Sequence, residues 1–257
     1  MAGSLIERTL GVIEILADEA EGVPLQQLAE QLAIPKSAAH RICNELIRLG
    51  HVRQHAASQR YQLTTRLVSL GLRYMSSIGT QDVVQPILDR LAEQSRELVR
   101  LAVANNHQLA WIAKAQGSRS GLRYDPDMGR VTPLATTATG HAWLACFSDE
   151  QALLLAEQQQ NTSPTLPISD TTALRAQLAL TRQRGFSAIQ DSMGPGTAAM
   201  ASAICDRHGS PLGVLSIAGP SVRLTAERID ALAPALISAA HELALVAPGS
   251  PLFSLSS

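Results

Sequence analysis

The stretch from Pro24 to Val52 constrains the fold most, because it holds two short amphipathic helices separated by a proline. In the first, Pro24 can occupy the first helical position, and the apolar stripe is Leu25, Leu28 and Leu32. Ile34-Pro35 ends that helix, since proline cannot continue it. Ser37 is expected to cap the second helix, Gly50 to end it, and its inward positions to be Ala39, Ile42, Leu46 and Leu49. Two helices joined this tightly indicate a helix-turn-helix.

The flanking segments complete a small domain. Residues Ser4 to Ala17 predict an earlier amphipathic helix with the stripe Ile6, Leu10, Ile13 and Ala17. After Gly50 the periodicity changes to two, and strands at Val52 to Gln54 and Tyr61 to Leu63 would flank a polar turn, as in a wing. We therefore expect a winged helix-turn-helix over residues 1–65, followed by a linker helix over 66–80 that also helps the chain to dimerise.

The outward face of the second helix indicates DNA binding. It carries Ser37, His40, Arg41, Asn44 and Arg48, all of which can donate to phosphates or base edges. An exposed Asn can pair with adenine and an Arg with guanine. We expect Ser37, His40, Arg41 and Asn44 to face bases. The predicted phosphate contacts are Lys36 at the helix N-terminus and, in the wing, Arg53 and Arg60, beside Gln59.

Charge is distributed unevenly along the chain, although the formal net charge is only -1. From Glu7 to Glu30, six acidic residues accompany a single base, Arg8. From Ile34 to Met75, seven bases accompany a single acid, Glu45. A local surplus of this kind suits a phosphate-binding surface, although a solvated helix face would show the same run.

Residues 81–257 have the pattern of a second, α+β domain. Helices are expected at 84–91, 140–146, 149–158, 171–184 and 225–245, and strands at 98–104, 109–113, 198–204 and 212–218. Residues 115–130 and 161–170 are rich in Gly, Ser, Asp and Pro and predict long loops. Some 175 residues with two long loops exceed what dimerisation needs, which favours a ligand-binding role.

Composition excludes several classes of protein. Hydrophobic residues make up 46% of the chain, so bulk disorder is not expected. The three cysteines are widely spaced, which predicts neither a disulfide frame nor a zinc site, and Cys146 and Cys205 lie in apolar runs typical of inert core thiols. The N-terminus does not resemble a signal peptide, and no apolar run approaches about 18 residues. We therefore expect a cytoplasmic protein with no membrane contact.

Enzymatic motifs fail in their context. Residues 194–199, Gly-Pro-Gly-Thr-Ala-Ala, match a dinucleotide fingerprint, but a strand rather than a helix is expected to follow. Residues 117–121 place Arg119 where a nucleophile elbow has serine. The histidines are scattered. We expect no catalytic residues, metal or cofactor, although a dinucleotide-binding enzyme remains an alternative.

The chain resembles IclR-family transcriptional regulators over essentially its whole length. The resemblance lies in SLIERTLGVIEILA, LAIPKSAAHRICNELIRLGHV, TPLATTATGHAWLA, RLT at Arg223 to Thr225 and the long segment from Arg184 to Pro220. It implies a GAF-like C-terminal domain that binds small acidic or aromatic-derived metabolites. It also implies homodimers or homotetramers on palindromic DNA operators, usually repressing, and no enzymatic activity.

The family's effector cavity gives candidate ligand-binding positions. By resemblance they are Arg123, Tyr124, Thr132, Ala138, Thr139, Ile189, Thr197, Ala199 and Ser216. The chain departs from the family at Ala135, at Gln190-Asp191-Ser192 and at Ala199, where the family usually has His, an acidic pair and Cys. Fewer fixed polar groups indicate a different, more neutral ligand.

The residues themselves allow two interpretations of this region. Thr136, Thr137, Thr139 and Gly140 could offer hydroxyl and N–H groups to an anion at a helix N-terminus, and Arg123 could pair with a carboxylate. The threonines could equally do no more than cap the helix. The sequence thus predicts an effector-controlled DNA-binding regulator, with a ligand-independent architectural DNA-binding protein as the alternative.

Overall fold

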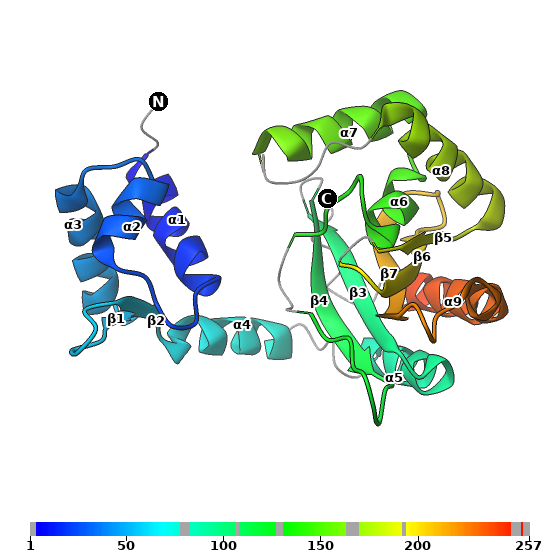
Figure 1. Cartoon of the computed structure of the whole chain (residues 1–257), viewed down its shortest axis with the longest axis horizontal. Helices are drawn as coiled ribbons and strands as arrows, with labels where there is room; N and C mark the ends of the chain where they lie inside the picture. Colours follow the sequence, from blue (N-terminus) through cyan, green and yellow to red (C-terminus); the bar gives the residue numbers. More distant parts are fainter. Residues whose placement is uncertain are drawn as a thin grey trace. The chain divides into compact units, whose positions relative to one another are not determined.

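The computed structural model describes residues 4–77, 83–105, 108–126, 131–162, 170–191, 194–247 and 253. Contacts divide the chain into two compact units, Met1–Ser77 and Ile78–Ser257. Figure 1 shows the helices and strands of each unit.

The N-terminal unit is a three-helix core with a two-stranded wing. Its elements are α1 (Leu5–Ala17), α2 (Leu25–Gln31), α3 (Lys36–Arg48), β1 (Val52–Gln54), β2 (Tyr61–Leu63) and α4 (Thr65–Ser77). Ser4 and Glu7 form a capping box that starts α1. The antiparallel wing pairs Val52 with Leu63, and Tyr61 also bridges to Val23. The helix-turn-helix, wing and following helix are therefore present as predicted.

The local predictions for the buried face of α1 and for the start of α3 were wrong. Helix α1 buries Val12 and Leu16, whereas Ile6 and Leu10 are exposed, because its core face is turned about one position from the predicted stripe. Pro35, rather than Ser37, is the N-cap of α3, since its carbonyl oxygen accepts from two amides of the first turn.

The end of α3 agrees with the sequence except at Leu49. Gly50 has a φ of +80° and ends the helix, as expected. Leu49 is 43% exposed, because it is the C-cap residue rather than part of the buried stripe.

The C-terminal unit is built on a five-stranded antiparallel sheet with strand order β4-β3-β7-β6-β5. The strands are β3 (Leu98–Asn105), β4 (Gln108–Gln116), β5 (Ser187–Gln190), β6 (Thr197–Cys205) and β7 (Pro211–Pro220). Strand β5 is missing from the prediction, because its four residues are too short to show an alternating pattern. The mixed α+β class is confirmed.

Helices cover this sheet in two groups (Figure 1). Helices α5 (Val84–Ser95) and α9 (Ala226–Val246) pack together and against the central strands. Helices α6 (Ala138–Leu144), α7 (Asp149–Thr162) and α8 (Thr171–Arg184) form the second group, and α6 contacts β5, β6 and β7. The core between α6 and the sheet includes Trp111, Trp143 and Ala201. This core and α6 frame an internal cavity.

Helix α9 is, within the described ranges, the one helix whose length and composition would allow it to cross a membrane. A core helix of a soluble domain meets the same criterion. One face of α9 is buried in the C-terminal unit, including Leu232, Leu236 and Leu243, and its first turn holds Glu227 and Arg228. Packing onto the sheet therefore accounts for its hydropathy.

Candidate nucleic-acid interface and effector cavity

The outer face of α3 presents a row of polar side chains. Ala39, Ile42, Cys43 and Leu46 are buried on its inner face. The residues predicted from the sequence are all exposed on the other face: Lys36, Ser37, His40, Arg41, Asn44 and Arg48. A helix packed on one side and polar on the other can enter a major groove.

Neighbouring contacts distinguish the residues of this row. The Asn44 amide nitrogen lies 3.4 Å from the His40 ring nitrogens, so these two side chains stand together one turn apart. Arg48 donates to Glu45 in an exposed ion pair, which lowers the pKa of the Glu45 carboxyl. The Arg41 side chain has no hydrogen bond or ion pair to another described residue. Arg41 is thus free to bind a base or phosphate, whereas Arg48 must first leave Glu45.

The wing places its two arginines differently. The Arg53 side chain in β1 is exposed and makes no hydrogen bond or ion pair with the described part of the chain. Arg60 donates from Nη1 to the Gly22 carbonyl oxygen at 2.7 Å, which ties the wing to the loop before α2. Gln59, with a φ of +55°, lies in the turn and donates to Ala56. Arg53 is therefore the freer phosphate ligand, and Arg60 also supports the fold.

In the C-terminal unit, five of the predicted effector residues line one internal cavity. They are Tyr124, Ala138, Thr139, Thr197 and Ala199, and the other lining residues are Arg100, Trp111, Thr137, Ala198 and Ala218. The start of α6, the start of β6 and the segment after β4 meet here. The cavity volume is about 10 Å³, close to that of one water-sized sphere. A metabolite would therefore need side chains around it to move apart.

The other four predicted effector residues lie elsewhere. Thr132 is fully buried, and its hydroxyl has no partner among the described residues. Ser216 is buried and donates to the Arg100 carbonyl oxygen. Ile189 borders a separate depression with Ala135. The Arg123 side chain is 57% exposed, lies 3.9 Å from Asp125 and does not line the cavity.

Arg100, which the sequence analysis did not single out, is the unusual group in this cavity. It lies in β3, is 3% exposed, and its Nε and Nη1 have no hydrogen-bond partner in the described chain. Its guanidinium carbon lies 3.9 Å from the centre of the Trp111 ring, a cation–π contact. A buried guanidinium with unpaired donors is costly, which makes it a functional candidate.

Arg100 keeps its positive charge although it is buried. Burial lowers the pKa of Arg100, whereas Tyr124 and Asp125 oppose that shift. Because the ordinary value is so high, the guanidinium stays protonated. Burial also raises the pKa of Tyr124, so the phenol keeps its proton. One fixed positive charge beside an indole and a phenol suits a ligand that combines an anionic group with an apolar body.

A sequence signal for Arg100 was available. An arginine interrupts the apolar run Leu98 to Ala104, where a strand buried on both faces would carry none. The threonines, by contrast, have local structural roles. The Thr137 hydroxyl accepts from the Gly140 amide at 2.9 Å and donates to the Pro133 carbonyl at 2.7 Å, so it caps α6.

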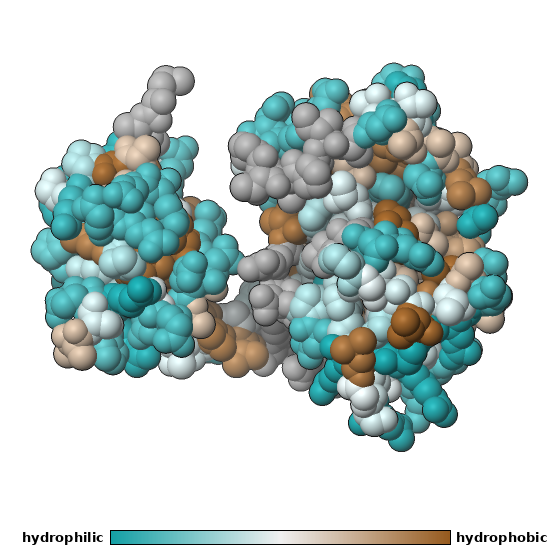
Figure 2. Space-filling model, in the orientation of Figure 1, coloured by the Kyte–Doolittle hydropathy of each residue, from teal (hydrophilic) through white to brown (hydrophobic). Residues whose placement is uncertain are grey.

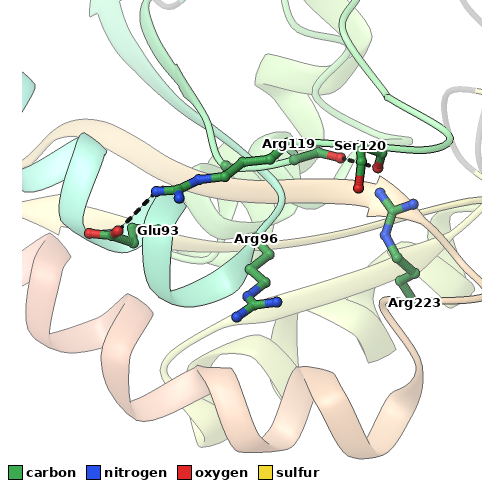
Figure 3. A pocket seen from close by; sticks show the side chains of 7 residues that line it. Glu93, Arg96, Arg119, Ser120 and Arg223 are labelled. Atoms are coloured by element: carbon green, nitrogen blue, oxygen red, sulfur yellow. Dashed lines mark hydrogen bonds and ion pairs between the residues drawn. The ribbon is translucent and has the colours of Figure 1, made fainter.

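A larger depression, with a volume of about 390 Å³, lies on the α5 side of the unit (Figure 3). Arg96, Arg119 and Arg223 converge on it, together with Glu93 and Ser120. Arg119 pairs with Glu93, and Arg223 makes two bonds to the buried Glu97 carboxylate and one to a backbone carbonyl. Carboxylates therefore balance most of the arginine charge, and the hydrogen bonds of Arg223 join the loop after β4 to the loop before α9.

The cysteines differ from expectation. Cys43 is buried in the helix-turn-helix core, and burial raises its pKa to about 11. Cys146 and Cys205 were expected to be inert core thiols, but each is partly exposed, and their sulfur atoms lie 3.8 Å apart. Residues 59 positions apart in the chain meet because α6 ends beside the last residue of β6.

Comparison with known proteins shows the family. The model "IclR helix-turn-helix domain" matches residues 5–56, and "Bacterial transcriptional regulator IclR C-terminal" matches residues 72–245. The chain is 31% identical to the "Acetate operon repressor" of Salmonella typhimurium, over 95% of this chain and 90% of that protein. It is 29% identical to "Transcriptional repressor IclR" of Escherichia coli, with the same coverage of 95% and 90%.

A solved structure shares the fold over nearly the whole chain. The IclR homologue of Microbacterium hydrocarbonoxydans, whose structure is described as a complex with 4-hydroxybenzoate, superimposes with a TM-score of 0.71. It is 22% identical, over 94% of this chain and 98% of that one. The resemblance seen in the sequence is thereby confirmed: this chain belongs to the IclR family of bacterial transcriptional regulators, which bind DNA and carry a C-terminal effector domain.

Proposed function

We propose that the protein is a transcriptional repressor whose affinity for its operator changes when a small carboxylate binds beside Arg100. The observation that carries this proposal is a buried guanidinium, facing an internal cavity, with two nitrogens that no described residue satisfies. A carboxylate would supply the missing acceptors in a bidentate geometry. The apolar lining from Trp111, Ala138 and Ala218 would hold the rest of the ligand.

For the DNA side, we propose that residues 1–65 read the operator and that residues 66–80 connect them to an effector domain over 81–257. Ser37, His40, Arg41 and Asn44 would face bases, and Lys36, Arg53 and Arg60 would bind phosphates. Support comes from the exposure of all seven residues in the helix-turn-helix and wing. The pairing of Arg48 with Glu45 makes Arg48 a secondary contact.

For the effector side, we propose that the carboxylate partner is Arg100 rather than Arg123. The exposed Arg123 would neighbour the entrance, and Tyr124 would move to admit the ligand, since it sits in an irregular segment at the cavity wall. Thr139, Thr197 and Ala199 line the same cavity, whereas Thr132 and Ser216 are buried outside its lining. An aromatic carboxylate is a suitable first probe because a related protein's structure is described as holding 4-hydroxybenzoate.

We further propose a homodimer or homotetramer on a palindromic operator. Helix α4 carries Val68 and Leu72, each 60% exposed and one turn apart, and α1 exposes Leu5, Ile6 and Leu10. Figure 2 shows hydrophobic side chains on the surface where α4 runs. Apolar stripes of this kind are typical of subunit contacts. We propose cytoplasmic residence and no catalytic activity, as suits a DNA-binding regulator of this family.

The test is operator binding with and without probe. Anisotropy of the duplex just upstream of the protein's own gene, against a random duplex, should show a preference of about 10³ or more. The probe 4-hydroxybenzoate, but not its neutral amide 4-hydroxybenzamide, should change that affinity and raise the melting temperature. Arg100→Gln should abolish both responses while leaving specific binding without ligand intact.

The outcomes separate the alternatives. Specific binding that no carboxylate in an aliphatic and aromatic panel alters would favour the ligand-independent architectural protein. Equal responses to the acid and the amide, or an Arg100→Gln variant that responds like the parent, would refute the role of Arg100. Equal, weak binding to both duplexes would require selection from random DNA to find the operator.

A further inference from the structure

Two thiols of the C-terminal unit meet at a place that the effector mechanism does not use. The sulfur atoms of Cys146, just after α6, and Cys205, the last residue of β6, are 3.8 Å apart. Both side chains are partly exposed, so a small oxidant can reach them. A disulfide has an S–S bond of about 2.05 Å, so closing the pair needs an approach of about 1.8 Å.

The surroundings distinguish the two thiols. The Arg182 guanidinium donates to the carbonyl oxygens of Ala145 and Phe147, at 2.9 Å each, and pairs with the Asp149 carboxylate, so it holds the turn that carries Cys146. The Cys146 thiol can donate to the Cys205 sulfur, which lowers the pKa of Cys205. The same bond and burial raise the pKa of Cys146. Cys205 is therefore the better thiolate, and Cys146 is the proton donor beside it.

A metal site explains the pair less well. No group of three or more His, Cys, Asp or Glu side chains that could hold a metal ion occurs within the part of the chain that the structure describes. Two sulfurs alone provide half of a tetrahedral zinc site. Close approach and partial exposure are instead the features of a redox-active cysteine pair.

We propose that Cys146 and Cys205 form a peroxide-oxidisable dithiol. The Cys205 thiolate attacks one oxygen of hydrogen peroxide, the O–O bond breaks, and a sulfenic acid and one water form, with the proton supplied by Cys146. The Cys146 thiolate then attacks the Cys205 sulfur, and the S–O bond breaks as hydroxide leaves and takes up a proton from solvent. In total the dithiol and one peroxide give a disulfide and two waters, and peroxide is the two-electron oxidant.

The disulfide would act on the effector cavity. Helix α6 and strand β6 both begin at that cavity, at Ala138 and Thr197, and both end at the thiol pair. Drawing their ends together would change how the helix sits on the strand, and so the space beside Arg100. This coupling rests on the proposed effector function, whereas the disulfide itself does not.

The chemical test uses the full-length protein and hydrogen peroxide. We expect loss of two of the three alkylatable thiols, a peptide pair joined through Cys146 and Cys205, and full recovery with dithiothreitol. Cys43, which is buried and has a raised pKa, is the internal control and should stay reduced. An unchanged thiol titre, or disulfides that join only separate chains, would overturn the proposal.

Two variants assign the roles. Oxidation of the Cys146→Ser variant should stop at a Cys205 sulfenic acid that dimedone traps. The Cys205→Ser variant should react with peroxide at least about tenfold more slowly than the Cys146→Ser variant, because its remaining thiol is the less acidic one. Circular dichroism of each variant checks the fold. Dimedone labelling of Cys146 in the Cys205→Ser variant as fast as that of Cys205 in the Cys146→Ser variant would refute this mechanism.

The coupling has its own measurement. The melting-temperature shift caused by 4-hydroxybenzoate should differ between the reduced and oxidised protein. An equal shift in both forms would refute the coupling. If neither form responds to any carboxylate in the panel, the effector proposal fails while the mapped disulfide still establishes the oxidation site.

Discussion

Asn44 and Arg53 differ in what they are free to do on DNA. Asn44 stands beside His40 on the exposed face of α3, at a position suited to a base edge, whereas Arg53 projects unpaired from β1. Asn44→Ala should cost about 1 to 3 kcal/mol on the operator and little on random DNA. Arg53→Ala should weaken both duplexes alike and reduce the slope of log K against log salt by about one.

Salt titrations of both variants on both duplexes test this difference. Arg60→Ala is less suitable as the phosphate variant, because it also removes the hydrogen bond to the Gly22 carbonyl and so disturbs the wing. An equal loss on operator and random DNA for Asn44→Ala would remove this residue from the set that reads bases.

The buried Arg100 guanidinium should lower the free energy of unfolding while it provides the binding site for a carboxylate. Its unpaired Nε and Nη1 are buried, and its compensation is the Trp111 ring at 3.9 Å and the neighbouring Tyr124. Arg100→Met keeps most of the volume and removes the buried charge. We expect the free energy of unfolding to rise by about 1 kcal/mol in urea, with loss of the carboxylate response.

The matched control for Arg100→Met is Arg90→Met. Arg90 pairs with Glu242 at the surface, where such substitutions change stability by less than about 0.5 kcal/mol. A destabilised Arg100→Met protein would show that the guanidinium is a structural group.

At the scale of single elements, two glycines in helices should respond oppositely to alanine. A Cβ at Gly140 in α6 would lie 2.2 Å from the Leu134 carbonyl oxygen, so backbone must move, and we expect a loss of about 1 to 3 kcal/mol. A Cβ at Gly71 in α4 meets nothing within 4 Å, and alanine there should stabilise by about 0.5 to 1 kcal/mol. Thermal unfolding of both variants provides the test, and equal signs would contradict it.

Sequence patterns predicted the elements in proportion to their length and regularity. Helices α8 and α9 and strands β6 and β7 show enough repeats to place them within one or two residues. Strand β5 failed because four residues carry no period. In α1 a run of apolar residues on several sides left the buried face undetermined, and packing selected Val12 and Leu16 over Ile6 and Leu10.

The candidate sites were predictable to different degrees for a physical reason. A recognition helix is one continuous segment, so helical spacing alone brings Ser37, Arg41 and Asn44 to one face. The effector cavity joins β3, the start of α6 and the start of β6, and the distance between these segments is set by the sheet register. An arginine in an apolar run marks Arg100 by itself, but its place at the cavity and the contact between Cys146 and Cys205 depend on how distant segments pack, which no local pattern predicts.

At the scale of the whole molecule, His141 should make stability depend on pH. It is 5% exposed, and burial lowers its pKa, with partial opposition from its hydrogen bond to the Ala135 carbonyl oxygen. The unfolded chain therefore binds this proton more tightly than the folded one. The contribution of His141 to the free energy of unfolding should be constant above the ordinary histidine pKa of 6.5 and should decrease as the pH falls below that value. The slope from this one group is at most about 1.4 kcal/mol per pH unit.

Urea unfolding between pH 5 and 8 measures this dependence. His141→Gln keeps a donor for the Ala135 carbonyl oxygen and should flatten the curve below neutral pH. His208→Gln, in the exposed turn between β6 and β7, is the surface control for the effect of replacing a histidine. The same slope in His141→Gln and the parent would assign the acid sensitivity to other groups.

On the proposed palindromic operator, assembly is the property of the whole molecule on which binding depends most. A palindromic site needs two winged helix-turn-helix heads, one for each half-site, and each head alone would make only the contacts of one half-site. Leu72→Lys on α4 should lower the mass in light scattering and weaken binding to the full palindrome, with little change on a half-site duplex. Leu245→Lys on α9, at a leucine that is 82% exposed, tests whether any exposed apolar residue has this effect. If Leu245→Lys dissociates the protein and Leu72→Lys does not, the subunit contact lies on the effector domain, and the two heads are paired through it rather than through α4.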